Sequence, residues 1–218
     1  MSMAPLRVAV LISGTGTNLR ALIHARQAGR LDLEFVQVIS NREAAPGLQH
    51  AREARIPTRI VAAADATLRD REMGAALAAC GAELVILAGY MCIIGPGLVA
   101  QYPGRMINLH PSLLPRYPGL DTYRRVLAAG DSEHGASVHF VTRELDAGPV
   151  IAQVRIPVHP HDNAESLAAR LGPLEHGLLV ATVELFTRRR VEMDSGAVLL
   201  DGRRLSEPLL LNELDQFD

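Results

Sequence analysis

Asn108 and His110 stand two positions apart at the end of a predicted strand at 105–109, directly before Pro111. Because successive side chains of a strand alternate between faces, both project from the same face. An amide donor beside an imidazole suits acyl transfer, since the amide can hold a developing oxyanion and the imidazole can manage a proton. Taken alone, the pair is equally compatible with a structural role, in which both side chains only form hydrogen bonds at the end of the strand.

A second polar segment, Glu144–Pro149, is predicted to form a turn that carries two carboxylates, Glu144 and Asp146, ahead of another strand. If one carboxylate reaches the imidazole of His110, it raises the histidine pKa and fixes the ring orientation. The residues alone therefore indicate a possible acyl-transfer site.

Ser13–Asn18 follows the first apolar run and reads SGTGTN, at the start of a helix-like stretch. Backbone amides of a glycine-rich turn at a helix N-terminus bind anions. A dinucleotide fingerprint would need Gly or Ala where Leu19 stands, and a conventional phosphate loop would need a lysine, which the chain lacks. We expect one phosphate, held by backbone amides with the side chains of Thr17 and Asn18; the alternative is a plain tight turn.

The elements that must position these residues alternate in type along the first half of the chain. Expected strands are 6–12, 35–39, 59–61 and 84–87, with helices at 18–28, 47–54 and 68–79. The second half adds strands at 105–109, 136–141 and 150–158. It also adds a helix from 121, with Asp121 as N-cap, to about 129, a long helix over 164–188 capped by Asp162 or Asn163, and a small hairpin after 191.

This alternation predicts an α/β fold with a Rossmann-like, mostly parallel twisted sheet and helices on both faces. We expect one domain over 1–218, with a phosphate-binding half at about 1–100 and a catalytic half at about 101–218. No repeat or linker divides it.

Composition narrows the function. The 218 residues carry a net charge of −2 without a basic excess, which argues against a nucleic-acid-binding surface. Every fixed cation is an arginine, so a Schiff-base lysine is excluded. Cys80 and Cys92 are too few for a disulfide scaffold, and neither a signal peptide nor a long apolar span is present. We expect a cytoplasmic protein that is not bound to a membrane.

One ordered set of motifs closely resembles the signature of the folate-dependent formyltransferases. It comprises Met106–Pro115 (MINLHPSLLP), Tyr117–Gly119 (YPG), Glu133–Val141 (EHGASVHFV), Leu145–Asp146 and Gly148–Ile151 (GPVI). The resemblance covers nearly the whole chain and weakens only in the tail. It implies formyl transfer from 10-formyltetrahydrofolate as co-substrate, with no metal.

Three features favour the glycinamide ribonucleotide branch of that family, which formylates 5-phosphoribosylglycinamide in purine biosynthesis. The run Ile12–Leu19 resembles that branch's loop for the ribose 5′-phosphate. The chain is also expected to lack the extra C-terminal domain of the branch that acts on methionyl-tRNA, and the N-terminal regulatory domain of the deformylases. Small molecules are the expected partners, and the chain is expected to be a monomer or a homodimer.

The resemblance also assigns site residues. The catalytic trio is Asn108, His110 and Asp146, and Asn108 also borders the folate. Substrate contacts fall on Gly16, Thr17, Asn18, Pro111 and Glu175, the last toward the ribose hydroxyls. Folate contacts fall on Arg69, Met91, Cys92, Ile93, Ile94 and Val141.

Two residues depart from the family pattern. Cys92 stands where the family usually has Arg, and Gly172 lies where a polar residue is common. Without the family, the apolar run 91–94 would be interpreted as core. The other histidines, His139 among them, are assigned to surface or structure. Two other functions remain open: a formyltetrahydrofolate hydrolase, which would use the same trio with water, and a non-catalytic nucleotide- or folate-binding module.

Overall fold

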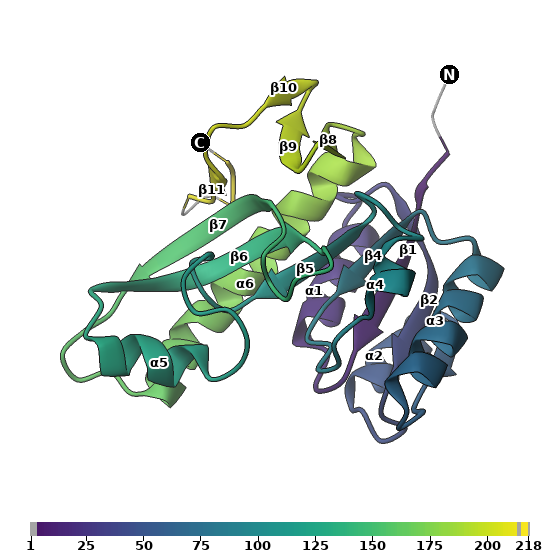
Figure 1. Cartoon of the computed structure of the whole chain (residues 1–218), viewed down its shortest axis with the longest axis horizontal. Helices are drawn as coiled ribbons and strands as arrows, with labels where there is room; N and C mark the ends of the chain where they lie inside the picture. Colours follow the sequence, from purple (N-terminus) through teal and green to yellow (C-terminus); the bar gives the residue numbers. More distant parts are fainter. Residues whose placement is uncertain (1–3, 213–214, 218) are drawn as a thin grey trace.

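The computed structural model describes residues 4–212 and 215–217, so the outermost ends of the predicted 1–218 domain lie outside the described residues. An eight-stranded twisted sheet forms its centre, in the order β11-β7-β6-β5-β4-β1-β2-β3 (Figure 1). Its strands are β1 (Leu6–Ile12), β2 (Leu33–Ser40), β3 (Thr58–Ile60), β4 (Leu84–Leu87), β5 (Met106–His110), β6 (Glu133–Phe140), β7 (Val150–Pro157) and β11 (Leu209–Leu210). Only β6 runs against its neighbours β5 and β7, so the expected mostly parallel sheet is confirmed.

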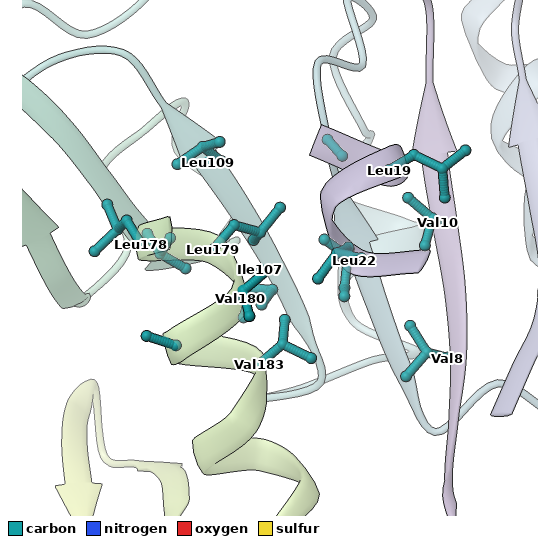
Figure 2. Packing of buried hydrophobic residues seen from close by; sticks show 14 of the residues in the cluster. Val8, Val10, Leu19, Leu22, Ile107, Leu109, Leu178, Leu179, Val180 and Val183 are labelled. Carbon is teal, nitrogen blue, oxygen red and sulfur yellow. The ribbon is translucent and has the colours of Figure 1, made fainter. Parts of the chain in front are cut away.

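Helices cover both faces of this sheet. They are α1 (Thr17–Gln27), α2 (Gly47–Glu53), α3 (Ala66–Cys80), the short α4 (Pro96–Val99), α5 (Thr122–Ala129) and α6 (Ala164–Thr187). Alternation along β1 explains the two layers: Val8 and Val10 lie in the core cluster with α1 and α6, whereas Ala9 and Leu11 lie in the cluster with α3. Figure 2 shows the first cluster, in which side chains of β1 and α1 lie on one side and those of β5 and α6 on the other.

Most predicted elements are found within two or three residues of their expected bounds, and Asn163 caps α6 in a reciprocal pair with Ser166. Asp121 is the N-cap residue of α5, as predicted, but its backbone is left-handed, with φ 57°, and its side chain makes no cap hydrogen bond. The tail hairpin is confirmed as β8 (Val191–Asp194) and β9 (Ala197–Leu200), and a third strand, β10 (Arg203–Arg204), joins it. Within 4–212 and 215–217, no helix combines the length and apolarity needed to cross a membrane.

Candidate active site

The three residues of the predicted trio converge at the carboxyl end of β5. Asn108 and His110 come from that strand, and Asp146 comes from the connection between β6 and β7. One Asp146 oxygen, Oδ2, lies 3.5 Å from His110 Nδ1, and the other, Oδ1, lies 3.5 Å from Asn108 Nδ2. One carboxylate therefore faces both candidate groups on the strand.

Local backbone geometry brings Asp146 to this position. Its φ is 50°, in the left-handed region that Asp tolerates better than most residues. Two residues later, a Cβ on Gly148 would collide with the carbonyl of Phe140, so the connection turns tightly only with glycine there. The backbone N–H of Gly119 donates to Asp146 Oδ2 at 2.8 Å and holds the carboxylate from the opposite side.

His110 is buried, and both ring nitrogens face protein groups. Nε2 lies 2.9 Å from the carbonyl oxygen of Tyr117, which can only accept, so Nε2 carries a hydrogen. The remaining nitrogen, Nδ1, faces Asp146. In the neutral ring, Nδ1 is therefore the nitrogen that can receive a proton.

Burial lowers the pKa of His110 below its ordinary value, although the Tyr117 carbonyl and the Asp146 carboxylate both act to raise it. The predicted direction of the Asp146 effect is thus found, but burial outweighs it. Burial also acts to raise the pKa of Asp146, but the His139 ring, the Gly119 N–H and the charge of His110 lower it overall.

His139, assigned to structure by the sequence, lies in this site. Its Nδ1 is 2.9 Å from the Phe140 carbonyl, so in the neutral ring Nε2 is the acceptor, and Asn108 Nδ2 lies 3.1 Å from it. This contact orients the Asn108 amide with its nitrogen toward the carboxylate side. His139 pairs directly with Asn108 across β5 and β6, and that antiparallel register is not readable from the sequence.

The glycine loop leads into α1 at the same edge of the sheet. Gly16 is the N-cap of α1, with φ 71°, and among the described residues no side-chain cap hydrogen bond is formed there. A Cβ on Gly16 would meet the Cα of Gly47 at 2.6 Å, so these two glycines let the loop pack against the start of α2. Thr17 is exposed at the first helical position. Free amides at a helix N-terminus are suited to an anion.

The Asn18 side chain lies near the carboxylate of Glu175 on α6 and acts to lower the pKa of that carboxyl. This contact joins the glycine loop to the predicted ribose-binding residue. Burial raises the pKa of Glu175, while hydrogen bonds from Tyr123 and Asn18 act to lower it. Pro111 is half-buried directly after β5.

The segment Met91–Ile94, which is predicted to contact the folate, contains both exposed and buried side chains. Met91 and Ile93 are exposed, 69% and 67%, whereas Ile94 is buried in the core cluster that Cys92 and Val141 border. Buried Ser13 accepts the Met91 N–H at 2.8 Å. Large apolar side chains exposed on a loop are consistent with a ligand surface.

Cys92 and Arg69, two other residues that are predicted to contact the folate, both contact protein groups. Ser13 Oγ donates to Asn41, whose amide donates to Cys92 Sγ at 2.9 Å, so the thiol is tied to the end of β1. Arg69 donates to the Ala63 carbonyl at 3.4 Å, and its buried Nε has no partner among the described atoms. Its neighbour Asp70 holds the Gly95 N–H at 2.7 Å, which places this helix beside the run. Among the described residues, no group of three or more His, Cys, Asp or Glu could hold a metal ion.

Comparison with known proteins gives a consistent set of relatives. The chain matches the family described as formyl transferase over residues 6–183. It is 43% identical over 203 residues to the phosphoribosylglycinamide formyltransferase of Escherichia coli (strain K12), which covers 92% of this chain and 96% of that protein.

Solved structures agree. A phosphoribosylglycinamide formyltransferase from Coxiella burnetii, in complex with CHES, has a TM-score of 0.88 and 44% identity, covering 93% of this chain and 96% of that one. A formyltetrahydrofolate deformylase from Pseudomonas syringae has a TM-score of 0.85 at 28% identity, covering 90% of this chain and 66% of that one. The fold is thus shared with both groups, and the sequence is nearer to the first.

Proposed function

Because the chain belongs to the formyl transferase family, we propose that it moves the formyl group of 10-formyltetrahydrofolate to the amine of 5-phosphoribosylglycinamide, a step of purine biosynthesis. The observation that carries this proposal is the meeting of Asn108, His110 and Asp146 at the edge of the sheet that also carries the glycine loop. An acyl-transfer site and an anion site then lie on one sheet edge, as a phosphorylated amine substrate requires.

The uncharged amine attacks the formyl carbon, a C–N bond forms, and the carbonyl electron pair moves to oxygen. One Asn108 amide hydrogen is held by His139, and the other makes only a long contact of 3.5 Å to Asp146. That second hydrogen is available to the oxyanion, where a preorganised donor lowers the barrier.

The proton of the attacking amine passes to the His110–Asp146 pair, directly or through a water that Asp146 orients. Protonation at Nδ1 creates an imidazolium against the carboxylate, and its positive charge then faces the oxyanion. When the intermediate collapses, the bond from carbon to the folate nitrogen breaks, and that nitrogen leaves with the proton. Atoms and charge balance without a metal.

Substrate binding is divided between two surfaces. The amides of Gly16–Asn18 hold the 5′-phosphate, Glu175 accepts from the ribose hydroxyls, and Pro111 borders the same substrate. The folate lies along Met91–Ile94, with Val141 and Arg69 beside it. Holding both reactants in one orientation supplies much of the rate, since effective molarities of well-oriented groups reach about 10⁵–10⁸ M.

The test is the absorbance change on incubating the protein with 10-formyltetrahydrofolate, with and without 5-phosphoribosylglycinamide. We expect tetrahydrofolate to form only when the glycinamide substrate is present. Formate release without that substrate would identify a hydrolase instead. Binding of both ligands without turnover would leave only a binding module.

A further inference from the structure

The side chains of Tyr123, Asn18 and Glu175 come from three different helices and lie close together. The hydroxyl of Tyr123, on α5, donates to Glu175 Oε1 at 3.2 Å, and the Asn18 side chain, on α1, lies near this carboxylate and acts to lower its pKa. The Asn18 Oδ1 atom is buried and has no hydrogen-bond partner among the described atoms. A buried acceptor without a partner is costly, so this atom is suited to a donor supplied by a ligand.

Packing holds the Tyr123 phenol in place. Its ring stands edge-on to His134, with the ring centroids 5.0 Å apart and the planes at 69°. His134 is buried, and burial lowers its pKa to about 4, so its ring is uncharged at neutral pH. The packing against His134 therefore positions the phenol ring, and the Tyr123 hydroxyl donates to Glu175.

The cluster matches two neighbouring hydroxyl groups. A carboxylate accepts hydrogen bonds and does not donate them, and the Asn18 Oδ1 also accepts. The Tyr123 hydroxyl occupies one lone pair of the Glu175 carboxylate, and the remaining lone pairs can accept from hydroxyl groups of a ligand. Asn18 also ends the glycine loop, so one ligand can reach the loop with a phosphate and this cluster with a diol.

We propose that Tyr123 is a positioning residue that fixes the Glu175 carboxylate for a cis-diol, and that Asn18 Oδ1 accepts from one of its hydroxyls. Together they make the site select ribose 5-phosphates over 2-deoxyribose 5-phosphates. This inference rests on the proposed function, because it concerns the ribose of the same substrate.

Calorimetric titration with ribose 5-phosphate and with 2-deoxyribose 5-phosphate tests the proposal without folate or turnover. We expect the wild type to bind the ribose compound at least about tenfold more tightly, the size of one hydrogen-bond contribution. Tyr123→Phe keeps the ring packing and removes only the hydroxyl. It should lose most of that preference while its affinity for the deoxy compound stays unchanged.

Two further measurements separate positioning from general support of the fold. Removing the Tyr123 hydroxyl raises the pKa of Glu175 further, so ribose 5-phosphate affinity should begin to fall at a higher pH in Tyr123→Phe than in the wild type as the solution is acidified. Added to Glu175→Gln, Tyr123→Phe should cause almost no further loss. Tyr102→Phe, in the core cluster on the other face of the sheet, is the matched control and should leave the preference intact.

An equal loss of affinity for both sugars, or an unchanged preference in Tyr123→Phe, would overturn the proposal. Melting curves of each variant show whether the protein is folded. The outcomes also separate this inference from the proposed function. Ribose selectivity without formyl transfer would contradict only the proposed function, whereas formyl transfer with unaltered selectivity in Tyr123→Phe would contradict only the role of Tyr123.

Discussion

The protonation of His110 sets the pH range in which the candidate site can work. Its ring is buried, and its pKa is the result of opposed effects: burial lowers it, and the Tyr117 carbonyl and Asp146 raise it. A lowered pKa suits His110 to accept a proton near neutrality, because a base must be unprotonated before the reaction. The Asp146 carboxylate then stabilises the charge that forms.

Replacing Asp146 by Asn should lower the pKa of His110 further, because one of the two effects that raise it is removed. We expect kcat to fall by about 10²-fold or more at neutral pH, within the range of general acid–base catalysis. Since the lower pKa keeps His110 unprotonated, and so able to act as a base, down to a lower pH than in the wild type, the ratio of variant to wild-type kcat should rise as pH falls. The measurement is kcat against pH for both proteins.

Glu144→Gln is the matched control for this experiment, because Glu144 is an exposed carboxylate of the same turn. Its pH profile should follow that of the wild type. A constant ratio for Asp146→Asn across the pH range would contradict action through the imidazole. A large loss of melting temperature with near-normal kcat would return Asp146 to a purely structural role.

Among elements, the segment Tyr117–Gly119 between β5 and α5 contacts both His110 and Asp146 through its backbone. The Tyr117 carbonyl meets His110, and the Gly119 N–H meets Asp146. The segment is anchored by the Tyr117 hydroxyl, which donates to Asp131 Oδ2 at 2.5 Å, and by an ion pair between Arg116 and the same carboxylate. Asp131 thus lies outside the site but holds the segment that shapes it.

Tyr117→Phe and Asp131→Ala should each lower kcat by roughly tenfold to a hundredfold, because small displacements of reacting groups are costly. Both KM values should change little. The two losses should not add in the double variant, since each substitution removes the same contact between Tyr117 and Asp131. Asp201→Ala, which removes an exposed carboxylate paired with Arg190, is the control and should keep normal kcat. Additive losses would contradict an anchor shared by Tyr117 and Asp131.

This segment also shows where prediction from sequence ends. Hydrophobic periodicity located β1, β4 and α6 because their core contacts repeat along the chain. The backbone at Tyr117 and Asp121 is left-handed, at φ 55° and 57°. The identity of these two residues does not predict that conformation. The anchor at Asp131 is 14 residues from Tyr117, and such a pairing follows from tertiary packing alone.

At the scale of the whole molecule, one sheet carries two sites that the sequence locates separately. The glycine loop follows β1, Asn108 and His110 lie on β5, and β4 lies between these two strands in the sheet. Parallel neighbours place their carboxyl ends on one edge, so the types of residue and the fold class indicated Asn108, His110 and the glycine loop, whereas Asp146 was assigned by the resemblance to the family. The contributions of His139 and Gly47 were not predictable, because they depend on which strand and helix become neighbours.

Binding of an anion at the glycine loop should stabilise the entire fold, because a ligand that binds only the folded state shifts the unfolding equilibrium. At a phosphate concentration 100 times its Kd, the gain is about 2.7 kcal/mol. For a chain of this size, that corresponds to a rise in melting temperature of roughly 5–10 °C. Inorganic phosphate should also compete with 5-phosphoribosylglycinamide and not with the folate.

Gly47→Ala tests whether that stabilisation comes from the loop. A Cβ on Gly47 would lie 2.8 Å from the Cα of Gly16 and 3.0 Å from the Gly14 carbonyl, so the loop must shift. We expect the phosphate-dependent rise in melting temperature to disappear, while the rise caused by the folate remains and shows that the variant is folded. Gly97→Ala, whose Cβ meets no atom within 4 Å, should retain both effects. Phosphate protection that survives in Gly47→Ala would place the anion elsewhere in the molecule.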